Sequence, residues 1–278
     1  MSGAKSVCLL LLLLLLLAAP LAGCGGRTQW LAGDDRTAFD RMIADARQAR
    51  VVFVGEFHDQ REHHTLQLDI IKALRQGGAP LAIGLEMFDM ESQPVLDRWV
   101  RGEMELRDFI AAYRQNWTVS WAEYDAILLY CRNNRISLVA LNAPAELVRK
   151  VAHAGFDSLS PDDRARLPAG VNGAATPSYR DFMREVFADH TLDAISFNNF
   201  CEAQAVRNNT MGRLIGDYLE KNPERSLVVI TGIGHAMRRA VADDLGKTAG
   251  VATRVIIPVT EGLLGRINRD DADYFVYP

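Results

Sequence analysis

Two glutamates and two histidines follow short apolar runs in this chain, and these residue types bind metal ions or transfer protons. A short β-branched run that ends at a glycine is typical of a buried parallel strand. Because the carboxyl ends of parallel strands meet at one edge of a sheet, residues far apart in sequence are expected to share a crevice there. The four residues are Glu56, His58, Glu86 and His235.

Three interpretations of this group stay open at the level of sequence. The four residues could bind a divalent metal, or serve as the catalytic acid and base of a hydrolase. They could also form a buried network of ion pairs and hydrogen bonds that holds the strand ends together, because ionised groups are almost never buried without partners.

Further polar residues fall on the apolar faces of two predicted helices, where they need partners or cost stability. They either hold a helix to the sheet or line the crevice. In the helix over residues 61–76 these are His63, which could equally be a core histidine, and Gln67; in the helix over 193–220 they are Gln204 and Asn208. Asn142, at the end of another predicted strand, completes the predicted lining.

Strands alternate with helices along the chain, which predicts an α/β fold with a mostly parallel central sheet covered by helices. Residues 91–133 and 155–220 are predicted to be helical insertions that cap the carboxyl edge of the strands, with 155–177 irregular. A helix is expected from residue 232 to about Leu245. The predicted strands cover residues 51–54, 81–85, 136–141, 227–231 and 252–258, with an edge strand over 274–277.

The N-terminus has the pattern of a secretory signal: one basic residue, Lys5, then the apolar run Leu9–Leu17 and small residues. Its ending, Leu-Ala-Gly-Cys at 21–24, resembles the bacterial lipobox, which implies cleavage before Cys24 and lipidation of that cysteine. The alternative is an ordinary signal peptide with a coincidental cysteine. We therefore predict a signal peptide over residues 1–23, a lipidated tether over 24–33 and one α/β domain over 34–278.

The residue after Cys24 is glycine, not the aspartate that retains many lipoproteins in the inner membrane. The lipobox resemblance therefore implies a lipid anchor in the cell envelope of a Gram-negative bacterium, in the outer membrane and facing the periplasm. Beyond Cys24 the mature chain has Cys131 and Cys201, which are either a disulfide or two buried thiols.

Composition and motifs exclude several classes of function. The formal net charge is −4 and no basic run is present, so nucleic-acid binding is not expected. The Gly-Ile-Gly turn at 232–234 has neither the GxGxxG pattern nor a P-loop lysine, which argues against nucleotide binding. A Gly-x-Ser-x-Gly elbow is also absent from the sequence, which argues against a serine hydrolase.

Several motifs, taken together and in order, resemble the ChaN-like haem-binding lipoproteins of the Tiki superfamily. They are Val-Gly-Glu-Phe-His-Asp at 54–59, His63-His64 with Gln67, Gly-Leu-Glu-Met-Phe at 84–88, Trp121 with Tyr124, Leu-Asn-Ala-Pro at 141–144, Glu-Ala-Gln at 202–204 and Gly-Ile-Gly-His-Ala at 232–236.

The resemblance implies a haem-binding protein of iron uptake that can form a homodimer around stacked haems. It implies a tyrosine ligand to the haem iron, for which Tyr179 and Tyr218 are the candidates in the second insertion. It also implies kinship with the Tiki proteases and erythromycin esterases, whose Gly-Glu-x-His, later Glu and later His positions match Glu56, His58, Glu86 and His235. A haem-binding protein and a metal-dependent hydrolase are therefore the two competing hypotheses.

Overall fold

A parallel sheet forms the centre of the computed structural model, which describes residues 29–32, 35–188, 195–242, 245, 250–263 and 265–278. Within these residues seven strands pair in the order β1-β7-β6-β2-β5-β3-β4, and every neighbouring pair is parallel. The predicted α/β class is therefore confirmed. The strands are β1 (Gln29–Ala32), β2 (Val51–Glu56), β3 (Leu81–Asp89), β4 (Ser137–Asn142), β5 (Ser226–Gly232), β6 (Thr253–Pro258) and β7 (Tyr274–Tyr277).

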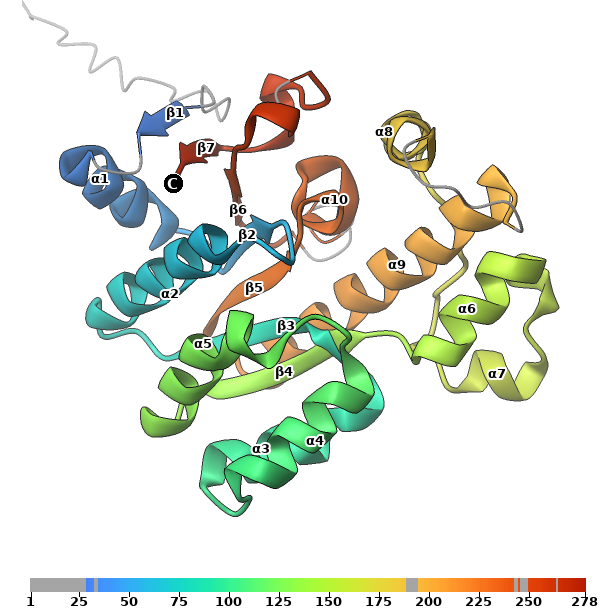
Figure 1. The fold of residues 1–278 in the computed structure, drawn as a ribbon, viewed down its shortest axis with the longest axis horizontal. Coiled ribbons are helices and arrows are strands. Elements are labelled where there is room, and N and C mark those ends of the chain that lie inside the picture. The colour runs from blue at the N-terminus through green and yellow to red at the C-terminus, as the bar shows by residue number, and fades with distance from the viewer. Residues whose placement is uncertain (1–28, 33–34, 189–194, 243–244, 246–249, 264) are drawn as a thin grey trace, which may run out of the picture.

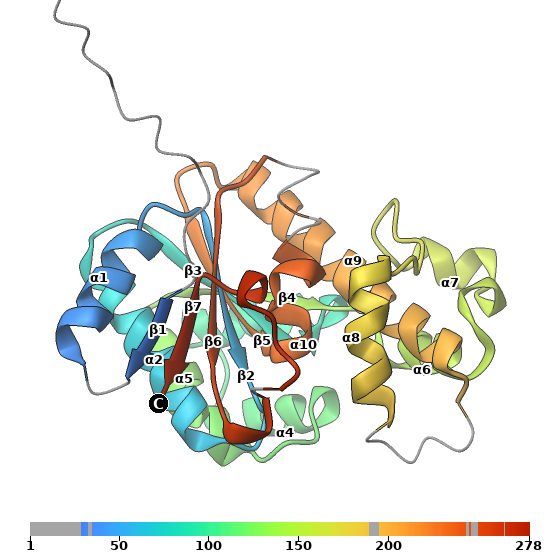
Figure 2. The same ribbon diagram turned by 90° about the horizontal axis from the view of Figure 1, so that it is seen from above.

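Helices cover both faces of the sheet (Figures 1 and 2). One apolar core joins the sheet to α1 (Arg36–Ala46), α2 (Arg61–Gln76), α3 (Gln93–Arg101), α4 (Leu106–Asn116) and α5 (Trp121–Asn133). The core on the other face joins it to α8 (Pro177–Ala188), α9 (Phe197–Lys221) and α10 (Ile233–Ala236). A third, smaller core packs α6 (Ala145–Ala154) on α9 beyond the sheet, with α7 (Pro161–Ala165) nearby.

The continuous apolar runs are explained by burial on both sides. In β2, Val52 and Val54 contribute to the first core, whereas Val51 and Phe53 contribute to the second. A strand whose two faces are both covered needs no polar residues, so its sequence reads as an unbroken hydrophobic run. This is the reason why the inner strands were predictable.

The helix ends follow ordinary capping chemistry. The carboxylate of Asp35 accepts a hydrogen bond of 2.9 Å from the amide of Ala38 and so caps the N-terminus of α1. Helix α2 spans the predicted residues and ends at Gly77, with Gly78 in the left-handed region. Its N-cap is Gln60, which makes no side-chain capping bond, so Asp59, a residue type that favours the N-cap, does not cap this helix.

Three segments differ from the sequence-based expectation. Residues 29–32 of the predicted tether form β1, so β7 is not the edge strand and the sheet begins before residue 34. Residues 155–177, expected to be irregular, include α7, which starts with a capping box at Ser160. The helix expected to reach Leu245 stops at Ala236 and is followed by a π turn (Arg238–Ala242), where Ala240 leaves the helical region.

The membrane-related predictions concern residues that the structure does not describe. The signal peptide over 1–23 and the lipid site Cys24 lie outside the described residues. In the described part of the chain, no helix has both the length and the apolar character needed to span a bilayer.

Candidate functional site

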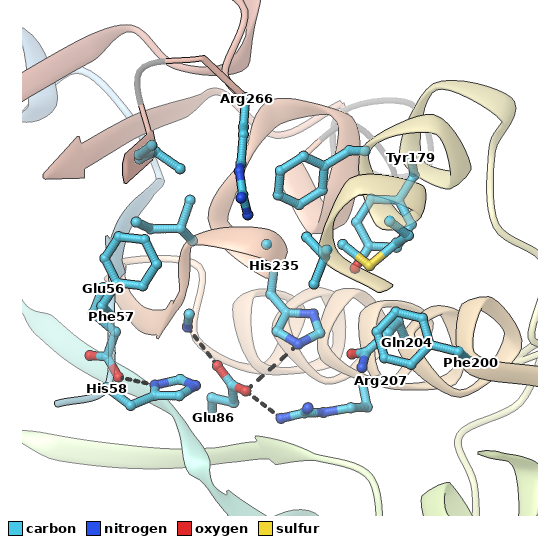
Figure 3. A pocket seen from close by; sticks show the side chains of 17 residues that line it. Glu56, Phe57, His58, Glu86, Tyr179, Phe200, Gln204, Arg207, His235 and Arg266 are labelled. Atoms are coloured by element: carbon cyan, nitrogen blue, oxygen red, sulfur yellow. Dashed lines mark hydrogen bonds and ion pairs between the residues drawn. The ribbon is translucent and has the colours of Figure 1, made fainter. Parts of the chain in front are cut away.

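The strand ends that were predicted to meet are the carboxyl ends of β2, β5 and β3, which are neighbours in the middle of the sheet. Strands β2 and β3 both pair with β5, and Glu56 stands opposite Gly232 in the register. Glu56, Glu86 and the two histidines that follow β2 and β5 therefore line one cavity, as Figure 3 shows. The structure thus brings together all four residues of the predicted cluster, from three strands.

Glu56 is fully buried and accepts hydrogen bonds from several directions. His58 Nδ1 and Gln67 Nε2 each lie 2.7 Å from a carboxylate oxygen of Glu56, and the hydroxyl of Tyr124 also donates to it. His64 Nδ1 lies 3.4 Å from the same group. Burial alone would raise the pKa of Glu56, but its bonds to the two histidines outweigh burial and lower the pKa to about 2.

Glu86 of β3 is the second buried carboxylate, and a cation from helix α9 neutralises it. Arg207 of α9 donates to one oxygen, while the Thr231 hydroxyl and the Gly232 amide lie 2.5 and 2.7 Å from the other. Burial opposes ionisation of Glu86, yet the positive charge of Arg207 holds its pKa well below the ordinary value. The carboxylate therefore stays charged and paired at neutral pH.

The two histidines of the cavity differ in their protonation. His235 Nδ1 lies 2.6 Å from the amide oxygen of Asn208, so this nitrogen carries the proton and Nε2 keeps its lone pair. Burial lowers the pKa of His235 to about 3, which makes it a neutral base. Burial also lowers the pKa of His58, but its bond to Glu56 and the charge of Glu86 outweigh burial and raise the pKa.

Arg207 is the functional residue that the sequence analysis missed. Its Nε donates to the side-chain oxygen of Asn142 at 3.2 Å, and Asn142 in turn donates to the backbone oxygen of Glu86 at 3.0 Å. The arginine is therefore oriented by one strand end and charge-paired with another. Its position next to Asn208 on α9 could have indicated a role for Arg207. Most arginines on helices are exposed to solvent, however, so the sequence alone did not single it out.

The cavity itself is mainly apolar and has a volume of about 420 Å³. Its walls come from the strand ends, from α8 and α9 of the second predicted insertion, and from the loop after β6 (Figure 3). Helices α8 and α9 thus act as the predicted cap, whereas α3, α4 and α5 pack on one face of the sheet. The apolar side chains are Phe57, Phe182, Met183, Val186, Phe200, Ile233 and Leu263, and the cations are Arg207 and Arg266.

Only one of the five predicted crevice residues lines this cavity directly. Gln204 does so, from α9. Gln67, Asn142 and Asn208 lie behind the wall, where each fixes a residue that reaches the cavity. His63 is buried outside the lining, and its Nδ1 accepts a 2.9 Å hydrogen bond from the amide of Phe57, so it holds the turn after β2.

The two candidate tyrosine ligands lie at opposite ends of the sheet. Tyr179 of α8 lines the cavity, as do His235 and Phe200 (Figure 3). Its hydroxyl is buried and has no hydrogen-bond partner of good geometry among the described residues, although Asn208 lies nearby. Tyr218 lies near Ser137 and Arg225, at the amino ends of β4 and β5, and does not line this cavity.

The geometry does not support a divalent metal at this site. Among the described residues, no group of three or more His, Cys, Asp or Glu side chains is arranged to hold a metal ion. The physical reason is that Tyr124, Gln67, Arg207 and Thr231 occupy the positions around the carboxylates where an ion would bind. Cys131 and Cys201 are both free thiols, buried in the cores on opposite faces of the sheet, so they form no disulfide.

The fold resembles that of known proteins. The ChaN protein of Campylobacter jejuni, solved with cofacial haem binding, superposes with a TM-score of 0.64 at 17% identity over 85% of this chain and 90% of that one. A mutant erythromycin esterase, EreC, in its open conformation superposes with a TM-score of 0.52 at 12% identity over 81% and 73% of the two chains.

Comparison of the sequence with known proteins found one similar protein and one matching family. The chloroplastic protein RETICULATA-RELATED 5 of Arabidopsis thaliana is 25% identical over 224 residues, which is 76% of this chain, although this chain spans only 30% of the length of that relative. Residues 42–245 match the family described as haem-binding uptake, Tiki superfamily, ChaN. Because this match covers most of the chain, including the cluster at the strand ends and the walls from α8 and α9, the chain belongs to that haem-binding family.

Proposed function

We propose that this chain is a lipid-anchored haem-binding protein of haem-iron uptake, and that haem binds in the cavity between the strand ends, α8 and α9. Family membership supports haem as the ligand. The observation on which the choice of site rests is the Tyr179 hydroxyl, which is buried at the cavity wall and makes no well-formed hydrogen bond with any described residue. A buried polar group without a good partner costs free energy, and a ligand atom that bonds to it would remove that cost.

The cavity residues fit haem in chemistry. A tyrosine oxygen is a known axial ligand for haem iron. The apolar walls from Phe182, Met183 and Phe200 suit the porphyrin ring, and Arg266 brings a positive charge suited to a propionate. Bound haem would supply a ferric iron that accepts the oxygen of Tyr179.

The protonation state of Tyr179 affects how this ligand binds. Burial raises the pKa of its hydroxyl above the ordinary value, while the charge of Arg207 acts in the opposite direction. The hydroxyl is therefore neutral in the ligand-free protein, and Tyr179 would have to release its proton to bind a ferric iron. We infer that Arg207, held by Glu86 and Asn142, eases that loss by placing a fixed positive charge near the oxygen.

The anchor and the dimer belong to the same proposal. Acyl chains on Cys24 would hold the protein in the outer membrane of a Gram-negative bacterium, on the periplasmic side. A second copy would face the cavity mouth, where Phe57 leaves 37% of its surface exposed. The cofacial haems of the Campylobacter jejuni protein are the motivation for placing two such sites opposite each other.

The test is a haem titration of three forms of the purified protein. Wild type should bind ferric haem saturably at micromolar concentration, with a high-spin spectrum typical of oxygen ligation. Tyr179→Phe should change that spectrum and weaken binding, because the iron loses its protein oxygen. Tyr218→Phe is the matched control and should match wild type, because Tyr218 lies at the other edge of the sheet. Wild type without saturable binding would refute the proposal.

A hydrolase remains the second candidate, and one observation favours it. His235 is bonded to Asn208 through Nδ1, which leaves the lone pair of Nε2 in the same cavity as the paired Arg207 and Glu86. Its Nε2 could take a proton from a water molecule that attacks an ester carbonyl. Hydrolysis of a chromogenic ester by wild type, abolished in His235→Gln with haem binding intact, would favour this candidate over the carrier.

A further inference from the structure

Two aromatic side chains lie exposed and in contact at the β1 edge of the sheet. Trp30 of β1 and Tyr277 of β7 each leave 41% of their surface exposed. Their ring centroids are 5.9 Å apart, and Trp30 also stacks on Phe275 at 4.5 Å. These two exposed rings form one patch, because the Trp30 ring stacks both on Tyr277 and on the buried Phe275.

The position of the patch follows from the alternation of side chains along the strands. Leu31, Tyr274 and Val276 point into the core on the α1 side, whereas Phe275 belongs to the opposite core. Trp30 and Tyr277 share the face of Phe275 through the stacking. On that face α9 packs towards β4, far from β1 in the strand order, so the described helices leave the two rings exposed (Figures 1 and 2).

The patch lies close to the predicted lipid site in the sequence. Trp30 follows Cys24 by six residues, and a fully extended chain of that length reaches roughly 20 Å. If Cys24 carries acyl chains, the patch therefore lies within about 20 Å of the bilayer surface. Tryptophan and tyrosine are the residues that favour the membrane–water interface, because their rings have an apolar body and a polar tip.

We propose that Trp30 and Tyr277 rest in the interfacial region of the membrane and set the orientation of the anchored domain. This inference rests on the proposed lipid anchor. A second copy of the chain is the competing occupant. A stable protein interface buries about 800 Å² on each partner. Two aromatic side chains of roughly 150–250 Å² each, 41% exposed, offer on the order of 200 Å², which is too little.

The experiment uses the mature, lipidated protein reconstituted into phosphatidylethanolamine and phosphatidylglycerol vesicles that carry brominated acyl chains. Bromine quenches tryptophan emission only at close range, so quenching reports a ring in the membrane. Wild-type emission should be quenched relative to plain vesicles, and Trp30→Phe should lose that quenching. Trp121→Phe is the matched control and should keep it, because Trp121 is partly buried and packs against the core residues Phe109 and Tyr113.

Each other outcome overturns the inference, and the outcomes are distinguishable. Protein that enters the vesicles without quenching in wild type would leave the anchor intact and place the patch away from the membrane. Absence of acyl mass on Cys24 would remove the anchor and, with it, this orientation. A concentration-dependent dimer of wild type in detergent that Trp30→Ser abolishes would assign the patch to a second copy.

Discussion

At the scale of single residues, the two buried glutamates are stabilised in different ways. Glu56 is held by neutral donors and by histidines that follow its own strand, whereas Glu86 is held by an arginine that comes from a helix 121 residues later in the sequence. The Glu56 network therefore joins α2 and α5 to β2, and the Glu86 network joins α9 to β3 and β5. Each network fastens helices on one face to the strand ends.

Replacing the first of these carboxylates should destabilise the fold. In Glu56→Gln the amide nitrogen would meet groups that already donate hydrogen bonds, and the buried His64 would lose its counter-charge. Breaking a buried pair costs about 3–5 kcal/mol, so the free energy of unfolding should fall by that amount in denaturant titrations. Glu91→Gln, which breaks the exposed pair with Arg166, should cost less than about 1 kcal/mol. Equal effects of the two variants would contradict the network.

The lowered pKa values of the buried His235 and Glu56 determine how the stability of the fold should depend on pH. The pKa of His235 falls from 6.5 to about 3 on folding, so below pH 6.5 the unfolded chain binds a proton that the folded chain does not. Glu56 adds to this below pH 4.5, because its folded pKa is about 2. Stability should therefore fall as the pH is lowered from 6.5 to about 3, by up to about 1.4 kcal/mol per pH unit for each group.

A variant can separate the histidine from the carboxylate in this profile. In His235→Gln the free energy of unfolding should no longer change with pH between 6.5 and 4.5. Its fall below pH 4.5, which comes from Glu56, should remain. His58 and His64 have raised pKa values, so their contribution is complete below pH 6.5 and is lost only as the pH rises above it. Urea unfolding at half-unit steps of pH would measure the free energy of unfolding in both pH ranges. If its pH dependence between 6.5 and 4.5 is the same in His235→Gln as in wild type, the ring of His235 is not a neutral base in the folded protein.

Residue types at strand ends were predictable, but their partners were not. Glu56, Glu86 and His235 could be predicted because a buried parallel strand marks its own carboxyl end. Tyr124 and Arg207 could not, because each comes from a helix whose distance and rotation relative to the sheet are set by packing over the whole core. Tyr124 belongs to one of the family motifs, but no pattern in the sequence indicates that its hydroxyl donates to Glu56.

At the scale of elements, close approach between neighbouring strands places a glycine where no side chain fits. A methyl group added to Gly84 of β3 would lie 2.5 Å from Cδ1 of Leu141, which is fully buried in β4. Gly84→Ala should therefore cost about 1–3 kcal/mol by overpacking, measured as a lower denaturation midpoint. Gly216→Ala, in α9 with open space around it, should instead stabilise by about 0.5–1 kcal/mol. If both variants lose stability, the close approach is not the cause.

Elements were predictable in proportion to the length of their hydrophobic pattern. Strands β2, β3 and β5 have continuous apolar runs, and α2 has a full apolar stripe over four turns. Strand β1 has four residues beside a glycine and pairs only with the last strand of the chain, so its partner lies more than 240 residues away. The length of α10 was overestimated because Met237, whose extended backbone ends the helix, is neither a proline nor a glycine and gives no signal in the sequence.

At the scale of the whole molecule, β1 places residues 29–32 beside the last strand of the sequence, β7. Because β1 pairs with β7, the residues that follow the predicted lipid site and the last strand share one edge of the sheet. The cavity, in contrast, lies at the carboxyl ends of the central strands β2, β5 and β3. The proposed anchor and the proposed haem site are therefore on different parts of the domain, so each can be altered without the other.

This separation makes the anchor testable in cells. Cys24→Ser should abolish acylation and move the protein from the outer-membrane fraction to the soluble periplasmic fraction, because several acyl chains give stable anchoring that weak surface contacts do not. The released protein should still bind haem as wild type does. Cys8→Ser is the matched control and should stay in the membrane fraction, because Cys8 lies in the segment predicted to be removed. Immunoblots of washed fractions, with mass spectrometry of the N-terminal peptide, measure both changes. A Cys24→Ser protein that stays with washed membranes would show that the lipobox does not explain its location.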